Sequence, residues 1–161
     1  MHKTALAALL ATVVAIPADA ADMYAGVRLG QARYNITGVA DSPSAFGVLG
    51  GYTINPNLAV EAEYIYLGSA NSSSATAMGA SALAFYPGDE PFSLFAKLSY
   101  TRSEWKTANQ VQNNASFTHG LGFQYDATQS MSVRFEWDRH MVGNQVAVNI
   151  DVLSVAGLVR F

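Results

Sequence analysis

Seven ionisable side chains follow one pattern in this sequence, and they are the first candidates for chemistry. Six of them lie two residues from another member of the set, and Lys97 stands alone among apolar neighbours. The set contains Glu61, Glu63, Lys97, Arg134, Glu136, Asp138 and His140. Carboxylates and cations that meet on one face can form a buried network of ion pairs. The same groups could instead line a path for ions, and a histidine beside carboxylates could take part in acid–base catalysis.

The spacing of these residues indicates which elements must hold them. Side chains of a β-strand point to opposite faces in turn, so residues two apart share a face. Glu61 and Glu63 therefore face away from Val60, Ala62 and Tyr64. Similar alternation, in segments of the length found in small membrane barrels, predicts eight strands at 23–34, 44–54, 58–68, 76–86, 92–104, 115–125, 131–141 and 147–161.

Composition places these strands in a membrane. Only 13% of the residues are charged and 50% are hydrophobic, whereas soluble domains carry about 25% charged residues. Beyond the N-terminal segment, no apolar run reaches the roughly 18–20 residues of a membrane helix. Every backbone polar group in lipid must be paired within the protein, so the other spanning structure is a closed barrel. The sequence therefore predicts an all-β fold, an eight-stranded antiparallel up-and-down transmembrane β-barrel.

The membrane also determines where the charges point. An Arg on the lipid face at the bilayer midplane costs about 2–4 kcal/mol, so we expect the mid-strand charges to face the lumen. The predicted lumen network contains Glu61, Glu63, Lys97, Arg134 and Glu136, with Arg28 and Asp138 as further candidates. Its role is structural or gating, and the narrow interior of an eight-stranded barrel favours the structural role. The Ala- and Ser-rich segment 76–86 does not reveal its lipid face.

The two ends of the chain carry further expectations. Residues 1–20 have a charged start, an apolar run and a small-residue cleavage site, as in a secretory signal peptide, so residues 21–161 form the predicted barrel domain. The last segment ends on Phe161 and must pair with segment 23–34 to avoid an exposed edge. The chain has no cysteine, so closure rather than disulfides must stabilise it. A net charge of −3 argues against nucleic acid as a partner.

The connections between predicted strands are of two kinds. Those near 55–57, 87–91 and 126–130 are short and rich in turn-forming residues. Those near 35–43, 69–75, 105–114 and 142–146 are polar and somewhat longer. Outer-membrane barrels have short periplasmic turns and longer outer loops, so we expect both termini in the periplasm.

Several segments together resemble the OmpA-like family of small eight-stranded outer-membrane barrels. They are Met23–Gly30, Gly50–Pro56, Val60–Gly68, Arg134–Trp137 and the run from Leu153 to Phe161. Because no peptidoglycan-binding domain follows, the chain looks like the stand-alone barrels of the OmpX, Ail and opacity-protein groups. The resemblance implies a monomer in a Gram-negative outer membrane, with periplasmic chaperones and the outer-membrane assembly machinery as partners. It also implies that Phe161 is the assembly signal.

The resemblance implies roles for single residues as well. Inward acids and bases pair across the lumen of family barrels, and the matching positions here are Glu61, Lys97, Arg134 and Glu136. Gln124 stands where the family has a lumen Glu, and segment 76–86 lacks the family's Lys, so one charge of each sign is lost. We expect a structural or surface-interaction barrel, with a narrow porin-like channel for ions or small solutes as the alternative.

An enzyme that modifies lipid A is a third hypothesis, since some eight-stranded barrels are such enzymes. A nucleophile, a base and an orienting group must lie within hydrogen-bond reach of one another. His140 shares a face with Asp138, but Ser132 lies further along, and His119 belongs to the opposite, lipid-facing side. The chain also lacks the His-x-Ser-Asn run of deacylases. We therefore expect no enzyme, no metal and no cofactor.

Cations and aromatic residues near the strand ends indicate contacts with the membrane surface. Arg102, Lys106 and Arg139 lie toward the predicted outer loops, where they contact lipopolysaccharide phosphates or serve as ordinary rim charges. Outer-membrane lipid and lipopolysaccharide are therefore expected partners. Aromatic girdles at the two membrane surfaces are predicted from Tyr24, Tyr66, Trp105, Tyr125 and Phe161.

Overall fold

The structure of the protein is a computed structural model that describes residues 22–35, 42–70, 73–87, 91–142 and 148–161. They form eight β-strands: β1 (Met23–Tyr34), β2 (Ser44–Asn55), β3 (Leu58–Ala70), β4 (Ser73–Pro87), β5 (Phe92–Thr107), β6 (Gln110–Asp126), β7 (Met131–Val142) and β8 (Val148–Arg160). Each strand overlaps one of the segments predicted from alternation. The predicted signal peptide lies outside the described residues.

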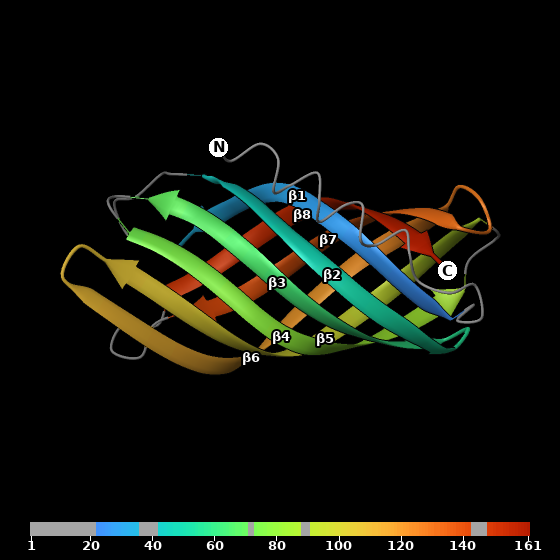
Figure 1. Ribbon diagram of the computed structural model, residues 1–161, viewed down its shortest axis with the longest axis horizontal. Helices are drawn as coiled ribbons and strands as arrows, with labels where there is room; N and C mark the ends of the chain where they lie inside the picture. Colours follow the sequence, from blue (N-terminus) through green and yellow to red (C-terminus); the bar gives the residue numbers. More distant parts are fainter. Residues whose placement is uncertain (1–21, 36–41, 71–72, 88–90, 143–147) are drawn as a thin grey trace.

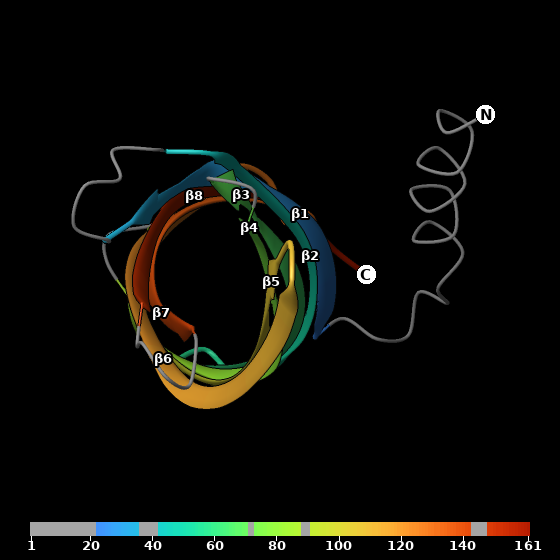
Figure 2. The same cartoon turned by 90° about the vertical axis from the view of Figure 1, so that its left-hand side faces the viewer.

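The strands close into one antiparallel barrel in which each strand pairs with its sequence neighbours. Closure comes from β1 and β8, whose register runs from Tyr24 opposite Arg160 to Tyr34 opposite Ile150. Figure 1 shows the barrel from the side, and Figure 2 shows the ring of strands from one end. Every described strand has a partner on both edges. The predicted eight-stranded up-and-down barrel is therefore confirmed.

Side chains alternate between a crowded interior and an apolar exterior. In β5, Phe95, Lys97 and Ser99 are buried, whereas Leu94 and Leu98 are exposed. All eight strands expose large hydrophobic residues, which is the surface expected of a wall in contact with lipid. Within the described part of the chain, no helix has the length and apolar character to cross a membrane.

The structure also determines the lipid face of β4. Ser81 and Leu83 are buried, whereas Met78 is 53% exposed. The side chains of β4 are too small to choose a face by themselves, and a register shift of one residue would exchange the two faces. The pairing of β4 with β5 determines which face of β4 points inward. Leu83 lies opposite Lys97, whose charge points into the lumen, so Leu83 points inward as well.

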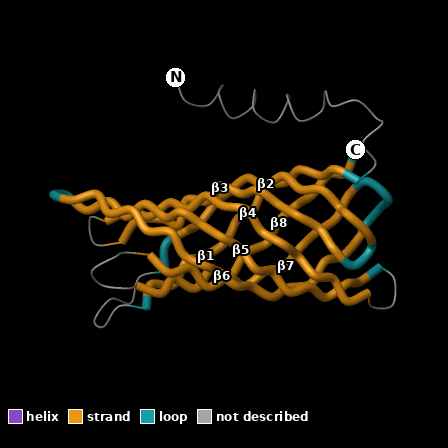
Figure 3. Tube along the Cα trace, turned by 90° about the horizontal axis from the view of Figure 1, so that it is seen from below, coloured by secondary structure: helices purple, strands orange, loops and turns teal. Residues whose placement is uncertain are grey.

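Two of the predicted outer loops are wrong in part, because strand continues into them. β5 extends to Thr107 and β6 starts at Gln110, while β3 extends to Ala70 and β4 starts at Ser73. Strands that pass beyond the hydrocarbon keep their backbone pairing without needing apolar outward residues, so polar composition alone does not end them. The hairpin of β5 and β6 projects from the end of the barrel opposite the C terminus (Figures 1 and 3). We call this the hairpin end, and the end where β1 begins and β8 finishes the turn end.

Two apolar clusters fill parts of the interior. The first, toward the hairpin end, contains Ala32, Tyr34, Ala45, Ile65, Leu67, Ala75, Ala77, Ile150 and Val152. The second, toward the turn end, contains Tyr24, Leu49, Ala59, Leu83, Phe95, Ala156 and Leu158. Buried charged side chains share the interior with these two clusters.

Two of the predicted girdle residues belong to this interior. Tyr24 is only 5% exposed, and Trp105 packs against the hairpin-end cluster with its ring 5.7 Å from that of Tyr34. Both residues lie an even number of positions from inward-facing residues of the same strand, so their side chains must also point inward. This alternation outweighs the general preference of aromatic rings for the membrane surface. Tyr66 and Tyr125 do lie on the outside, packed on neighbouring aromatic rings.

Candidate functional site: the interior of the barrel

A group of five charged side chains spans the middle of the lumen. Arg28 donates through Nη1 to Glu63 Oε2 at 2.8 Å and through Nη2 to Asp138 Oδ2 at 2.6 Å. Lys97 Nζ donates to Glu136 Oε1 at 2.5 Å and to Glu63 Oε2 at 3.1 Å. Each of these side chains is at most 3% exposed. We call this group the central ion layer.

The odd-numbered strands supply the charges of the central ion layer, and glycines on even-numbered strands leave room for them. Gly79 lies opposite Glu63, and Gly120 lies between Lys97 and Asp138 in register. A Cβ added at Gly120 would meet Asp138 Oδ1 at 2.1 Å, which is far inside van der Waals contact. Because these glycines on the adjacent strands carry no side chain, the long charged side chains beside them have room to extend into the narrow lumen.

A second ion pair lies closer to the turn end. Arg134 Nη1 donates to Glu61 Oε1, and the hydroxyl of Tyr24 donates to the same oxygen at 2.6 Å. Arg134 also donates to Gln124 Oε1, through Nη2 at 3.0 Å, and its guanidinium lies 5.0 Å from the ring centre of Phe95. We call this group the lower ion pair. Among the residues that the structure describes, no ion pair joins it to the central ion layer. A guanidinium with several planar and charged partners is held in one orientation.

The structure thus divides the residues of the predicted lumen network into two groups. Glu63, Lys97 and Glu136 lie in the central ion layer, whereas Glu61 and Arg134 form the lower ion pair. Sequence reasoning missed the interior role of Tyr24. Its parity with Arg28 on β1 was the available signal.

His140 lies in the interior of the barrel. It is 1% exposed, and neither ring nitrogen has a hydrogen-bond partner among the described residues. Ser132 is engaged elsewhere, since its hydroxyl donates to Asp126 Oδ1 at 2.6 Å. In the same described residues, no group of three or more His, Asp or Glu side chains could hold a metal ion. His119 is on the outside, beside the ring of Trp137.

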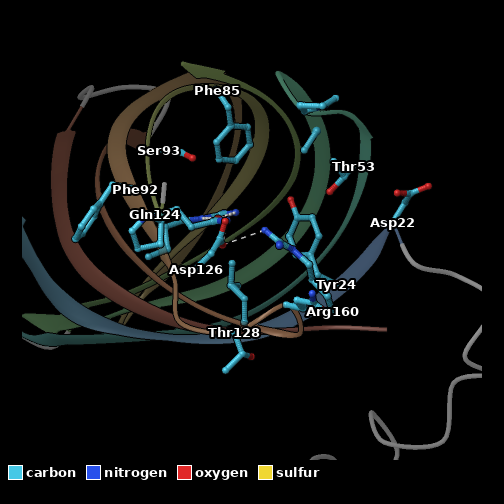
Figure 4. Close-up of a pocket in the computed structure, with 16 residues that line it drawn as sticks. Asp22, Tyr24, Thr53, Phe85, Phe92, Ser93, Gln124, Asp126, Thr128 and Arg160 are labelled. Atoms are coloured by element: carbon cyan, nitrogen blue, oxygen red, sulfur yellow. Dashed lines mark hydrogen bonds and ion pairs between the residues drawn. The ribbon is translucent and has the colours of Figure 1, made fainter. Parts of the chain in front are cut away.

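The turn end of the lumen opens into a vestibule of about 550 Å³ (Figure 4). Arg134 and Gln124 line its inner part, and Phe85 and Tyr24 contribute aromatic walls. At its rim Arg160 Nη2 lies 3.1 Å from Asp126 Oδ1, and each of these two side chains is about one third exposed. The vestibule is therefore a solvent-accessible entrance that leads to Arg134 of the lower ion pair.

The three surface cations singled out from the sequence differ in their surroundings. Lys106 Nζ lies 2.8 Å from Glu104, and Arg139 Nε lies 2.7 Å from Asp151. Arg102 is exposed and has no ion pair or hydrogen bond to another described side chain. Phe161 is partly exposed, and its backbone N–H donates to the carbonyl of Met23 at 3.1 Å.

Solved structures of similar shape include bacterial surface and outer-membrane proteins. With neisserial surface protein A, the chain has a TM-score of 0.68 and 19% identity over 86% of its own length and 97% of that protein. With the attachment invasion locus protein Ail of Yersinia pestis, the TM-score is 0.61 and the identity is 16%, over 88% of this chain and 99% of Ail. With OprG of Pseudomonas aeruginosa, the TM-score is 0.56 and the identity is 12%, over 88% of this chain and 97% of OprG. At these identities the likeness concerns the fold, and no curated protein matches the chain.

Family membership rests on the sequence itself. The model that describes the outer membrane protein beta-barrel domain matches residues 4–161. This match covers nearly the whole chain and agrees with the closed eight-stranded barrel and its apolar exterior. The resemblance to small outer-membrane barrels is thereby confirmed, and the chain belongs to the outer membrane protein beta-barrel family.

Proposed function

We propose that this outer-membrane barrel is closed to ions and has a structural or surface-interaction role. The observation that carries the proposal is the central ion layer, in which two cations and three carboxylates occupy the lumen between β1, β3, β5 and β7. An eight-stranded barrel has an interior that side chains can fill, so such a layer leaves little room for a water column. The apolar clusters on either side add further barriers to a hydrated ion.

The energy of the ion pairs supports a static lumen. Removing one partner of a buried pair costs about 3–5 kcal/mol, because the other charge stays buried without compensation. Lys97 contacts both Glu63 and Glu136, so moving its ammonium aside would leave two carboxylates short of a partner. Thermal motion rarely supplies that energy, since every 1.4 kcal/mol lowers a population tenfold.

Single-channel recording tests the proposal directly. The refolded protein in a planar bilayer is expected to give no steady conductance at neutral pH. Lys97→Met serves as a comparison, because it removes the cation at the middle of the central ion layer. Steady openings of the unmodified protein, with a slope conductance that rises with salt concentration, would refute the closed lumen.

A narrow channel for ions or small solutes is the second candidate. The vestibule of about 550 Å³ favours it, because this opening at the turn end of the lumen is lined by Arg134 and Gln124. The lower ion pair would then act as a gate, opening when Arg134 leaves Glu61. In that case Arg134→Met should raise the conductance of the refolded barrel. Lys97→Met should raise it only if the central ion layer also blocks the path.

We propose that both termini face the periplasm, so that the hairpin end is outside. Support comes from the polar hairpin of β5 and β6, which projects from the end opposite the start of β1 and the finish of β8. The chain lacks cysteine, so single cysteines can report the orientation. A membrane-impermeant maleimide should label Ala108→Cys in intact cells and should not label Gln129→Cys, and the reverse pattern would overturn the orientation.

The remaining partners are proposed from family membership. We expect periplasmic chaperones to deliver the chain, the assembly machinery to recognise Phe161, and the folded barrel to be a monomer in lipid. No catalytic activity is assigned. Hydrolysis of lipopolysaccharide by the purified barrel, abolished in His140→Ala, would overturn that assignment.

A further inference from the structure

The outer wall of the barrel contains a recess over β2, β3, β4 and β5. It is a shallow, open depression with a volume of about 630 Å³. Gly50, Ala62 and Ala80 form its floor, and they lie directly opposite one another in register. We call this feature the outer recess.

Large side chains border the outer recess and give it a defined shape. Tyr64 and Met78 face each other in the adjacent row and are 46% and 53% exposed. Tyr100 lies opposite Ala80, at the β5 side of the floor. A Cβ added at Gly50 would meet a single atom, at 3.8 Å, so the space above this glycine is open to the outside. The outer recess is therefore a shallow depression with small residues at its floor and large side chains at its border.

One cation borders the outer recess. Arg102 lines it and lies opposite Met78 in register. Lys106 and Arg139 on the same wall are each paired with a carboxylate. Arg102 has no such partner among the described residues, so its charge is available to a ligand. Arginine binds phosphate through parallel hydrogen bonds, which makes a phosphorylated headgroup the matching chemistry.

We propose that the outer recess binds one molecule of lipid A, the phosphorylated glycolipid of lipopolysaccharide. An acyl chain lies on the floor formed by Gly50, Ala62 and Ala80, and a phosphate contacts Arg102. The choice of lipid A over an inner-leaflet phospholipid rests on the proposed orientation, which puts Arg102 toward the outer leaflet. The proposal does not depend on whether the lumen conducts.

A second copy of the chain fits the outer recess less well. Small residues do allow close packing of membrane proteins, but a partner barrel would have to supply a carboxylate for Arg102. On the described outer wall near the hairpin end, Glu104 and Asp151 are already paired with cations of their own chain. An anionic lipid supplies the charge without breaking an existing pair.

Native mass spectrometry of the refolded protein in micelles tests the site. The added lipids are lipid A, phosphatidylglycerol and phosphatidylcholine, each in a separate titration. Gly50→Phe fills the floor, and Arg102→Gln removes the charge. Gly157→Phe is the matched control for bulk, because a Cβ there meets nothing within 4 Å. Arg33→Gln is the matched control for charge, since Arg33 is exposed on β1.

The expected result is a one-to-one complex with lipid A for the unmodified chain and both controls. Loss of a charge-assisted contact should weaken lipid A binding about tenfold in Arg102→Gln, and Gly50→Phe should weaken it at least as much. If all four variants bind lipid A equally well, the outer recess is not the binding site. Equal retention of phosphatidylcholine or phosphatidylglycerol would overturn the choice of lipid A. A dimer that Gly50→Phe abolishes would assign the recess to a second copy instead.

Discussion

The lower ion pair offers the sharpest test of how the interior stabilises the barrel. In Arg134→Met an apolar side chain of similar length replaces the guanidinium, and Glu61 keeps only the hydroxyl of Tyr24 as a close partner. Both charged side chains are at most 1% exposed. Leaving one charge of such a pair uncompensated costs about 3–5 kcal/mol. We therefore expect the free energy of unfolding to fall by that amount.

A double variant separates the charge from the packing. Glu61→Gln combined with Arg134→Met removes both charges while leaving an acceptor for Tyr24, so most of the lost stability should return. Arg160→Met is the comparison at the vestibule rim. Its pair with Asp126 is about one third exposed, and exposed pairs contribute about 0–1 kcal/mol. Urea titration of the refolded variants in lipid vesicles, followed by tryptophan fluorescence, measures all four proteins.

Two results would refute this reasoning. The first is a loss in Arg134→Met no larger than that in Arg160→Met, because burial would then add nothing to the pair. The second is a double variant that is as unstable as the single one, because the cost would then come from packing against Phe95 rather than from the unpaired carboxylate. A steady conductance in Arg134→Met with unchanged stability would favour the gating role.

Three further predictions concern other parts of the barrel. Gly120→Ala should lower the unfolding free energy by about 1–3 kcal/mol through overpacking against Asp138, whereas Gly157→Ala on the open wall should leave it nearly unchanged; urea titration compares the two. His140→Leu should retain or raise stability, because a buried imidazole without partners is replaced by an apolar side chain of similar size; a drop of several kcal/mol would reveal an unseen partner. Phe161→Ala should reduce the amount of protein assembled in the outer membrane of cells without reducing refolding of the purified chain into lipid. Equal losses in both assays would show that Phe161 acts through stability alone.

Closure and the faces of most strands could be predicted from the sequence because two strong physical effects agree. Charges such as Lys97 and Arg134 are costly in lipid, and the period of two then assigns every other residue of the strand. β4 carries no central charge, so its face had to come from pairing with β5. Residues 105–114, at the tip of the hairpin of β5 and β6, have the pattern of a loop because strands outside the hydrocarbon lose the apolar half of the alternation.

The pairing inside the lumen is a different matter. Glu61 pairs with Arg134, whereas Glu63 pairs with Arg28 and Lys97. The spacing of the two glutamates in the sequence does not predict these different partners. Those partners come from strands that are distant in the sequence, so the choice depends on the stagger of strands around the ring. The same stagger brings Tyr24 to Glu61.

The separation of the interior charges into two groups has a consequence for how the barrel resists leakage. A solute that enters the vestibule meets the lower ion pair first and the central ion layer afterwards. The two groups share no charged residue, so they form two separate barriers. The two barriers act like resistors in series, so the larger one limits the current even when the other is removed. Substitutions at Glu61 or Arg134 can therefore accumulate at a cost in stability while permeability stays unchanged. Only a chain altered in both groups would expose the cell to leakage.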